Sequence, residues 1–215
     1  MNWRRLKGIE WLDRRARFLS GTPMGGRHLE AGCSTCLPLR HFAELRPDVK
    51  FSALDYHDFS SHVPSGIDFH QLDLIKGDLP FPNATFDSIT LMHVMEHLPH
   101  FGKVPSEFQR VLKPGGRLYV EGPGPRSLLF PSSLKTVTLN FWDDATHIAP
   151  LSYGRINSVF GIEGMRAVAK GHNRSWPLIL AMPWTFLKRD WHHFLAGFIH
   201  LFGWNVYVVF QKKPE

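Results

Sequence analysis

Hydrophobic and polar positions change their period several times along the chain. Short runs of apolar and β-branched residues, typical of strands, alternate with segments in which apolar residues recur every three or four positions, as in helices. The strand-like runs are 26–32, 50–56, 68–73, 86–92, 117–123, 164–170 and 205–213. The helix-like segments are 2–19, 36–45, 57–62, 94–98, 104–112 and 152–160. Strands that alternate with helices predict an α/β fold: a doubly wound, mostly parallel seven-stranded sheet with helices on both faces.

The composition is that of an ordinary globular protein. The chain has 215 residues, of which 43% are hydrophobic and 20% charged, and a single domain is expected at this length. Two cysteines are too few for a disulfide scaffold, and the N-terminus lacks the apolar run of a secretory signal. The longest apolar stretch, 176–204, is interrupted by Lys188, Arg189 and Asp190 before it could span a bilayer. These features predict a cytoplasmic protein.

The positive charge gathers at the two ends of the chain. Lys and Arg exceed Asp and Glu by 25 to 19, and the excess lies in 1–27 and 170–215, which also hold six of the seven tryptophans. Basic residues beside Trp suit an anionic interface, so these ends could contact a membrane peripherally. The alternative is that they are covering helices with solvated arginines and buried tryptophans. No nucleic-acid partner is expected, because no binding module is recognised, and the oligomeric state stays open.

Acidic residues stand where the first three predicted strands end. The first strand ends in Glu30-Ala31-Gly32 and runs into a helix, while the second and third end at Asp55 and Asp73. In a parallel sheet these ends meet at the edge where ligands bind. A carboxylate after the second strand can accept both hydroxyls of a ribose. A carboxylate after the third is placed to accept a hydrogen bond from an exocyclic amine. The sequence therefore predicts a nucleoside site.

Three motifs follow Asp73 in order. Leu79 to Asp87 reads LPFPNATFD, His93 to Leu98 reads HVMEHL, and Arg110 to Gly116 reads RVLKPGG. With the acidic strand ends, they resemble the class I S-adenosylmethionine-dependent methyltransferases, particularly the small-molecule, type 11-like branch. The resemblance covers 26–123 and extends more loosely through 143–147. It implies a Rossmann-like fold and an enzyme that transfers a methyl group to a small or amphipathic acceptor by in-line displacement, leaving S-adenosylhomocysteine.

The resemblance also implies which residues contact S-adenosylmethionine. Glu30, Ala31 and Gly32 would meet its methionine portion, Asp55 and Tyr56 its ribose, Asp73 and Leu74 its adenine, and His93 the side of the transferable methyl. The turn at 113–116 is expected to be structural and to lie away from the cofactor.

His147 is the catalytic candidate. It lies after the fifth strand, in a segment that usually crosses the mouth of the site in this fold, and would act as general base toward a hydroxyl acceptor. Asp143 and Asp144 would orient it or anchor the acceptor. The alternative role for His147 is a structural hydrogen bond that holds this segment.

The glycine loop departs from the family pattern. The family reads G-x-G-x-G, whereas this chain has Gly32, Ser34 and Cys36. Serine adds bulk on the side of the cofactor, and cysteine crowds the contact between helix and strand. A catalytically weak or inactive binding subunit is therefore an alternative to an enzyme. Cys33 and Cys36 also form the C-x-x-C of thiol oxidoreductases, a hypothesis that leaves the other motifs unexplained.

The segment His93 to His97 also matches the H-x-x-E-H pattern of some zinc hydrolases. Such a site needs a long helix and a third protein ligand. Pro99 ends this segment after little more than one turn, so zinc hydrolysis is disfavoured and no metal is expected.

The single domain is expected to have four parts. Residues 1–25 would form an N-terminal helix, 26–123 the cofactor-binding core, 124–204 an acceptor-side or lid region, and 205–213 the final strand. The apolar stretch 171–204 would roof the sheet. A more specific hypothesis is that it forms an acceptor pocket or docks on a membrane, giving access to a lipid-linked acceptor.

Overall fold

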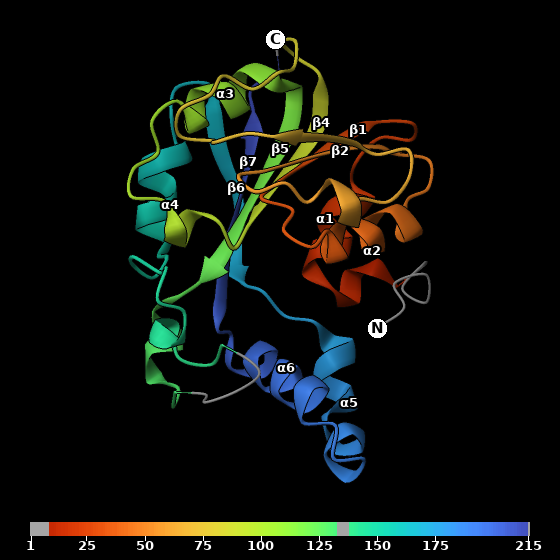
Figure 1. The fold of residues 1–215 in the computed structure, drawn as a ribbon, viewed down its shortest axis with the longest axis vertical. Coiled ribbons are helices and arrows are strands. Elements are labelled where there is room, and N and C mark those ends of the chain that lie inside the picture. The colour runs from red at the N-terminus through yellow and green to blue at the C-terminus, as the bar shows by residue number, and fades with distance from the viewer. Residues whose placement is uncertain (1–8, 133–137, 215) are drawn as a thin grey trace.

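The seven strands form one sheet in the order β3-β2-β1-β4-β5-β7-β6. The computed structural model describes residues 9–132 and 138–214. The strands are β1 (Arg27–Ala31), β2 (Lys50–Asp55), β3 (Asp68–Gln71), β4 (Phe86–Met92), β5 (Leu112–Pro123), β6 (Met165–His172) and β7 (Asn205–Lys212). Neighbouring strands are parallel except that β7 runs antiparallel to both β5 and β6. The expected doubly wound, mostly parallel sheet is confirmed (Figure 1).

β5 begins five residues earlier than the sequence pattern predicts. Phe86 pairs with Leu112 and Ser88 pairs with Arg117, so the intervening Lys-Pro-Gly-Gly segment bulges out of the ladder. Gly115 at its centre has a φ of 76°, which glycine adopts without steric cost. The segment is thus an irregular start of the strand, and it lies at the edge opposite the strand ends that were expected to bind the cofactor.

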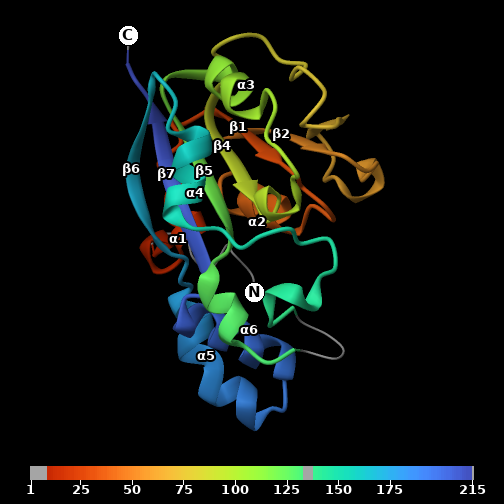
Figure 2. The ribbon, with the colours of Figure 1, turned by 90° about the vertical axis from the view of Figure 1, so that its left-hand side faces the viewer.

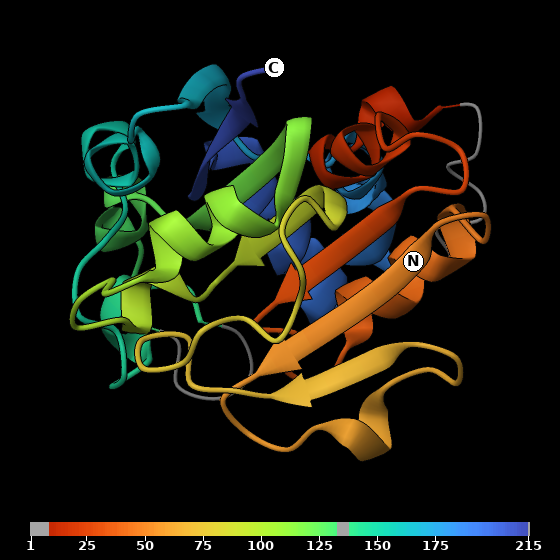
Figure 3. The same cartoon turned by 90° about the horizontal axis from the view of Figure 1, so that it is seen from above.

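Two layers of helices cover the two faces of the sheet (Figure 3). On one face lie α1 (Arg14–Ser20) and α2 (Leu37–Leu45), whose buried side chains join a core with Tyr119 and Tyr207. On the other face lie α3 (Val104–Val111) and α4 (Tyr153–Phe160), which join a core with Leu29 and Leu118. Successive residues of β1 point to opposite faces, so Leu29 enters the second core while His28 packs against Phe42 of α2.

The expected N-terminal helix over 2–19 is shorter where the structure describes it. A single 3₁₀ turn, η2 (Glu10–Leu12), precedes α1, which begins at Arg14 because Asp13 caps it. The Asp13 carboxylate accepts hydrogen bonds from the backbone N–H groups of Arg15 and Ala16. Residues 1–8, where this helix was expected to begin, lie outside the described residues. The predicted pieces at 57–62 and 94–98 are also single 3₁₀ turns, η3 (Ser60–His62) and η4 (Met95–His97).

A pair of helices projects beyond the carboxyl ends of the strands (Figures 1 and 2). α5 (Trp176–Leu187) and α6 (Trp191–Phe202) pack against each other, and Gly197 lets them approach: a Cβ there would lie 2.7 Å from the carbonyl oxygen of Leu178. The sequence predicted that 171–204 would roof the sheet, but the hairpin extends past the sheet edge instead. Within 9–132 and 138–214, no helix is long and apolar enough to cross a bilayer.

Candidate functional site

The carboxyl ends of β1, β2 and β4 and the loop after β3 open onto one cavity of about 430 Å³. Six of the residues expected to contact a cofactor line it: Gly32, Asp55, Tyr56, Asp73, Leu74 and His93. The sequence analysis assigned no cofactor contact to several other lining residues, among them His57, Leu72, Val94, His97 and Thr146. Because parallel strands end at the same edge, the acidic strand ends converge as their order along the chain predicts.

Gly32, directly after β1, lies against the side chain of Val94. Its φ is 78°, and a Cβ at this position would lie 2.1 Å from Cγ2 of Val94. Its backbone N–H donates to the carbonyl of Leu54 at 2.8 Å, which ties the loop to the end of β2. Only glycine combines this backbone conformation with this contact, so the wall of the cavity here is bare backbone.

Asp55 and Asp73 both point toward the cavity, and each is held by backbone N–H groups. The Asp55 carboxylate accepts from Ser34 at 2.8 Å and from His57 at 3.0 Å. The Asp73 carboxylate accepts from Ile75 at 3.0 Å, and this hydrogen bond, with Lys76, lowers the pKa of Asp73 despite a small opposing desolvation. Both carboxylates are therefore oriented acceptors at the cavity wall.

Ser34 and Cys36 replace the second and third glycines of the family pattern, yet both adopt the backbone conformation that glycine favours. Ser34 has a φ of 46° and Cys36 a φ of 56°, both in the left-handed region. Ser34 lines the cavity, whereas Cys36 is buried behind it. The Sγ atoms of Cys33 and Cys36 lie 3.2 Å apart as free thiols, and burial raises the pKa of Cys33. An activated C-x-x-C cysteine needs a lowered pKa, so this geometry does not support the oxidoreductase hypothesis.

His93 occupies a strained position at the end of β4. Its φ is 56°, although it is not glycine, and such strain is typical of functional sites. Its Nε2 lies 3.6 Å from Glu121 and its Nδ1 lies 3.4 Å from Glu96. Desolvation lowers the pKa of His93, but the neighbouring carboxylates of Glu121 and Glu96 outweigh it and raise the pKa to about 9. The two carboxylates thus favour protonation of the ring, whereas Arg15 Nη2, which can only donate, lies 3.4 Å from its Nε2.

Glu121 is the centre of a buried polar network that the sequence analysis missed. Its carboxylate is fully buried on β5 and accepts hydrogen bonds from Arg15, Tyr119, Asn173 and Asn205. The pKa of Glu121 is lowered, because these donors and His93 overcome the cost of burial. The network joins α1, β5 and β7 behind His93, and the sequence gives no signal of it because its members are far apart along the chain.

Glu30 and Ala31 lie behind the cavity wall. Glu30 is 2% exposed and Ala31 is fully buried, and neither lines the cavity. Desolvation raises the pKa of Glu30 to about 8, against an opposing contribution from Arg15. Any contact of these two residues with a ligand would therefore be made through the backbone or through other groups.

The ring of His147 is buried beside the cavity. Its Nδ1 lies 2.6 Å from the carbonyl oxygen of Phe141, the two rings stack at 4.5 Å, and the His97 ring lies 4.8 Å away. Its neighbour Thr146 lines the cavity. With Nδ1 bound to a carbonyl, only Nε2 of His147 is available for chemistry.

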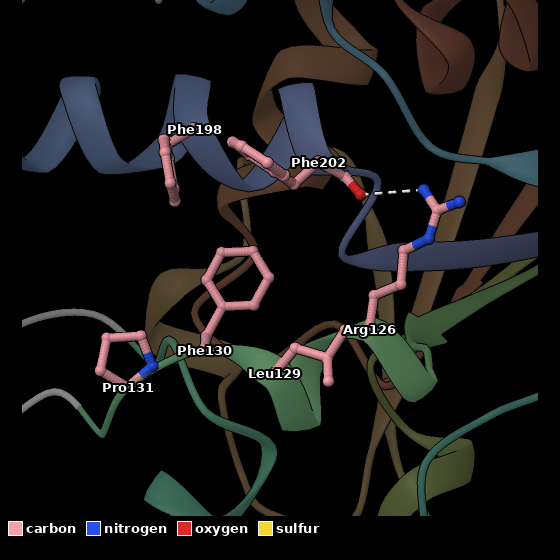
Figure 4. Close-up of a pocket in the computed structure, with 6 residues that line it drawn as sticks. All are labelled: Arg126, Leu129, Phe130, Pro131, Phe198 and Phe202. Atoms are coloured by element: carbon pink, nitrogen blue, oxygen red, sulfur yellow. Dashed lines mark hydrogen bonds between the residues drawn. The ribbon is translucent and has the colours of Figure 1, made fainter.

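A second cavity of about 440 Å³ lies between η5 (Pro125–Leu129) and α6 (Figure 4). It is lined by Arg126, Leu129, Phe130, Pro131, Phe198 and Phe202. Arg126 Nη1 donates to the carbonyl oxygen of Phe202 at 3.0 Å, so the guanidinium closes one side of an otherwise apolar wall. Trp204, just beyond α6, lies 6.4 Å from the His93 ring. The residue that follows α6 by two positions therefore lies beside a wall residue of the first cavity.

A family model of the methyltransferase domain matches residues 29–120. The demethylmenaquinone methyltransferase of Listeria monocytogenes is 34% identical over 82 residues, which are 35% of this chain and 35% of that protein. The sterol 24-C-methyltransferase of Eremothecium gossypii is 31% identical over 105 residues, 45% of this chain and 28% of that protein. The chain thus covers about a third of the length of the curated relatives it matches.

Solved methyltransferases share the fold over nearly the whole chain. A chain in the complex of the Haloferax volcanii Trm112 methyltransferase activator with its methyltransferase has a TM-score of 0.67 at 16% identity, over 99% of this chain and 94% of that one. An S-adenosylmethionine-dependent methyltransferase from Mesorhizobium loti has a TM-score of 0.63 at 15% identity, over 92% and 97%. Residues 29–120 are thus similar to a methyltransferase domain, as the motifs led us to expect, and nearly the whole chain shares the fold of solved methyltransferases.

Proposed function

We propose that the protein transfers a methyl group from S-adenosylmethionine to a small lipophilic acceptor. The observation that carries the proposal is the convergence of Gly32, Asp55 and Asp73 on one cavity. A cavity of about 430 Å³ lies in the size range of cofactor sites, and the missing Cβ of Gly32 lets the Val94 side chain pack against the loop at the cavity wall. The residues present therefore fit the cofactor of the family.

Each lining residue has a distinct binding role in this proposal. When bound, S-adenosylmethionine supplies an electrophilic methyl group on a sulfonium. Asp55 would accept the ribose hydroxyls beside Tyr56, Asp73 would accept the adenine amine, and Leu74 would pack on the ring. His93 would lie beside the methionine portion and keep the methyl-bearing end in place. Glu30 and Ala31 would act from behind the wall, through the backbone of Gly32.

The chain would accelerate the reaction mainly by alignment, because the donor is already activated. His147 is our candidate for acid–base chemistry through Nε2, since Nδ1 is held by the carbonyl of Phe141. Its buried ring also supports the alternative role, in which it positions the segment that carries Thr146 into the cavity.

The apolar second cavity supports a lipophilic acceptor. Phe130, Phe198 and Phe202 form edge-to-face and tilted contacts around it, and such walls bind flat or aliphatic molecules without hydrogen-bonding specificity. The relatives named for demethylmenaquinone and sterol methylation act on molecules of this character. We propose that the acceptor's apolar part lies here and its reactive atom near His93.

The α5–α6 hairpin would bring the protein to such an acceptor at a membrane. Its exposed large side chains are Trp176, Leu180, Trp184, Phe186, Leu187, Trp191, Leu201 and Phe202. Lys188 and Arg189 lie in the turn between the helices, and the Lys188 ammonium stacks on the Trp184 ring at 5.0 Å. Exposed aromatic residues beside basic residues are typical of surfaces that bind anionic lipid headgroups.

Calorimetry with S-adenosylmethionine and S-adenosylhomocysteine tests the cofactor site. The chain should bind both, and Asp55→Asn should weaken both, while Asp58→Asn, an acidic residue just outside the cavity, should not. Radiolabelled methyl transfer to quinol and sterol acceptors then tests the reaction. Cofactor binding without methyl transfer to any acceptor would support the inactive binding subunit that Ser34 and Cys36 suggest. The absence of a binding signal for either S-adenosyl compound in calorimetry would overturn the proposal.

A further inference from the structure

Glu96, His97 and His147 converge beside the cavity. One donor atom from each lies within 4.8 Å of the others. Glu96 and His97 belong to η4, just after β4, and His147 comes from the loop before α4, fifty residues later. His97 lines the cavity itself, as does Thr146 next to His147. The three side chains therefore share one point on the acceptor side of the proposed cofactor site.

The Glu96 carboxylate is under-satisfied. Its side chain is fully buried, and neither carboxylate oxygen accepts a hydrogen bond from the residues that the structure describes. The nearest charged group is His93, whose Nδ1 lies 3.4 Å from Oε1. A buried carboxylate that accepts no hydrogen bond lacks a partner for its lone pairs, and a metal ion at Glu96 would supply one.

Hydrogen bonds fix which nitrogen of each histidine is free. The hydroxyl of Thr146 donates to the Asp144 carboxylate at 2.6 Å, because a carboxylate can only accept. The hydroxyl oxygen of Thr146 also lies 2.9 Å from His97 Nδ1. Because the hydroxyl hydrogen is already donated to Asp144, this oxygen accepts a hydrogen bond from Nδ1. His147 Nδ1 likewise donates to the carbonyl of Phe141 at 2.6 Å. These hydrogen bonds occupy Nδ1 of both rings, so Nε2 is the nitrogen that each ring can offer to a metal ion.

This is the arrangement that metal-binding histidines adopt. A ligating histidine donates its second ring N–H to a carbonyl or a hydrogen-bonded side chain, which fixes the tautomer and the ring orientation. Two imidazole nitrogens and one carboxylate suit Zn²⁺ and other divalent first-row transition ions, and they leave a coordination position open. Bonds of about 2.0–2.2 Å would draw the three donor atoms somewhat closer together than they are now.

We propose that Glu96, His97 and His147 bind a divalent transition-metal ion whose open position faces the acceptor side of the cavity. The sequence argued against a metal because H-x-x-E-H lacked a long helix and a third ligand. The structure supplies a third group from a distant loop, while His93 lies between the carboxylates of Glu96 and Glu121, so the set is not the one that the motif pairs.

The proposal deepens the proposed function and rests on it for the role of the ion. An acceptor hydroxyl bound at the open position would have a lowered pKa and would lose its proton to water. His147 would then act as a ligand rather than as a general base. The substrate class becomes an acceptor that carries an oxygen next to its lipophilic part.

The test is metal binding by the purified full chain, without cofactor, after treatment with a chelator. Zn²⁺ and Co²⁺ should each bind one ion per chain in calorimetry, Co²⁺ should give the visible spectrum of a four- or five-coordinate site, and Mg²⁺ should not bind. His97→Gln and Glu96→Gln should each weaken Zn²⁺ binding at least about tenfold, which is about 1.4 kcal/mol. His192→Gln, in the exposed His192–His193 pair, should leave it unchanged.

Several outcomes separate this proposal from the proposed function. Absent Zn²⁺ and Co²⁺ binding, or undiminished binding in folded His97→Gln, overturns the metal site, and calorimetry with S-adenosylhomocysteine still reports on the cofactor site. Loss of Zn²⁺ binding in His192→Gln would place the ion on the α5–α6 hairpin and would also overturn it. Circular dichroism of each variant identifies loss by unfolding, and His97→Gln is the decisive variant because its ring is only partly buried.

Discussion

Arg15 on α1 donates from Nε to the buried carboxylate of Glu121 on β5 at 3.1 Å. The Arg15 side chain is 21% exposed and that of Glu121 is fully buried, so the pair is largely shielded from solvent. Glu121 is also one of the two carboxylates that hold His93 in the cavity wall. The first described helix of the chain therefore fixes a residue of the candidate site through one ion pair.

Replacing Arg15 by Leu should cost stability and cofactor affinity together. Removing one partner of a buried pair leaves an uncompensated charge, at about 3–5 kcal/mol in the free energy of unfolding. Urea denaturation measures the first effect and calorimetry with S-adenosylhomocysteine the second. Arg17→Leu, an exposed arginine of the same helix, is the matched control and should stay near the parent. Equal stability of Arg15→Leu and Arg17→Leu would show that the pair contributes nothing.

The acidic strand ends could be predicted from the sequence, whereas the Arg15–Glu121 pair could not. Asp55 and Asp73 follow recognisable strands, and a parallel sheet brings consecutive strand ends to one edge without further information. Arg15 and Glu121 are 106 residues apart, and no local periodicity relates them. The hydrophobic character of 171–204 could also be predicted, but the direction in which the α5–α6 hairpin projects could not. Whether a helical hairpin covers a sheet or extends past it depends on tertiary packing.

The contacts of His147 could not be predicted either, because they are long-range. Its place near the site follows from the family resemblance, but its contacts depend on how the preceding loop folds. Asn140 and Asp143 cap the turn η6 (Phe141–Asp143) reciprocally, and this capped turn presents the Phe141 carbonyl to His147. Its meeting with Glu96 and His97 is a long-range contact that spacing along the chain does not encode.

Gly32→Ala should weaken cofactor binding, because the added Cβ would clash with Val94. Val94→Ala as a second substitution should relieve that clash in part. The new Cβ would lie 2.1 Å from Val94 Cγ2, and the positive φ adds about 1–2 kcal/mol of backbone strain. Calorimetry should show a loss of affinity for S-adenosylhomocysteine of more than about tenfold. Val94→Ala added to Gly32→Ala removes the clash but not the strain, so it should recover some stability in thermal unfolding. No recovery would mean that Val94 is not what excludes a side chain.

Two buried residues on β1 should give the stability opposite pH dependences. Burial lowers the pKa of His28 to about 3 from 6.5, so between these values the unfolded chain binds a proton that the folded chain does not. Stability from His28 is therefore lost as pH falls from about 6.5 toward 3. Glu30 has its pKa raised from 4.5 to about 8, so the folded chain binds the extra proton. Its contribution is complete below about 4.5 and is lost as pH rises toward 8.

Each residue should change the free energy of unfolding by about 1.4 kcal/mol per pH unit inside its own window. Between about pH 4.5 and 6.5 the contributions of His28 and Glu30 to the free energy of unfolding change in opposite directions with pH. Outside that range only one of the two residues contributes a slope. Other groups titrate there too, so the measurement is the difference between variant and parent in urea unfolding at several pH values. His28→Gln should reduce the pH dependence of the free energy of unfolding on the acid side. Glu30→Gln should reduce it above about pH 6.5. Parallel curves for a variant and the parent would mean that the residue titrates alike in both states.

The α5–α6 hairpin should determine binding to lipid. Burying a large apolar side chain contributes about 1.5–3 kcal/mol, so Trp184→Gln with Leu187→Gln should weaken vesicle binding by more than about tenfold. Both side chains are more than 60% exposed, so the folded state should tolerate the changes. Met24→Gln is the control, because Met24 is 91% exposed just before β1, at the opposite edge of the sheet. Co-sedimentation should favour anionic over neutral vesicles through Lys188 and Arg189, and that preference should weaken with salt. Equal pelleting with both lipids, or the same loss in Met24→Gln, would mean that the hairpin is not a membrane contact.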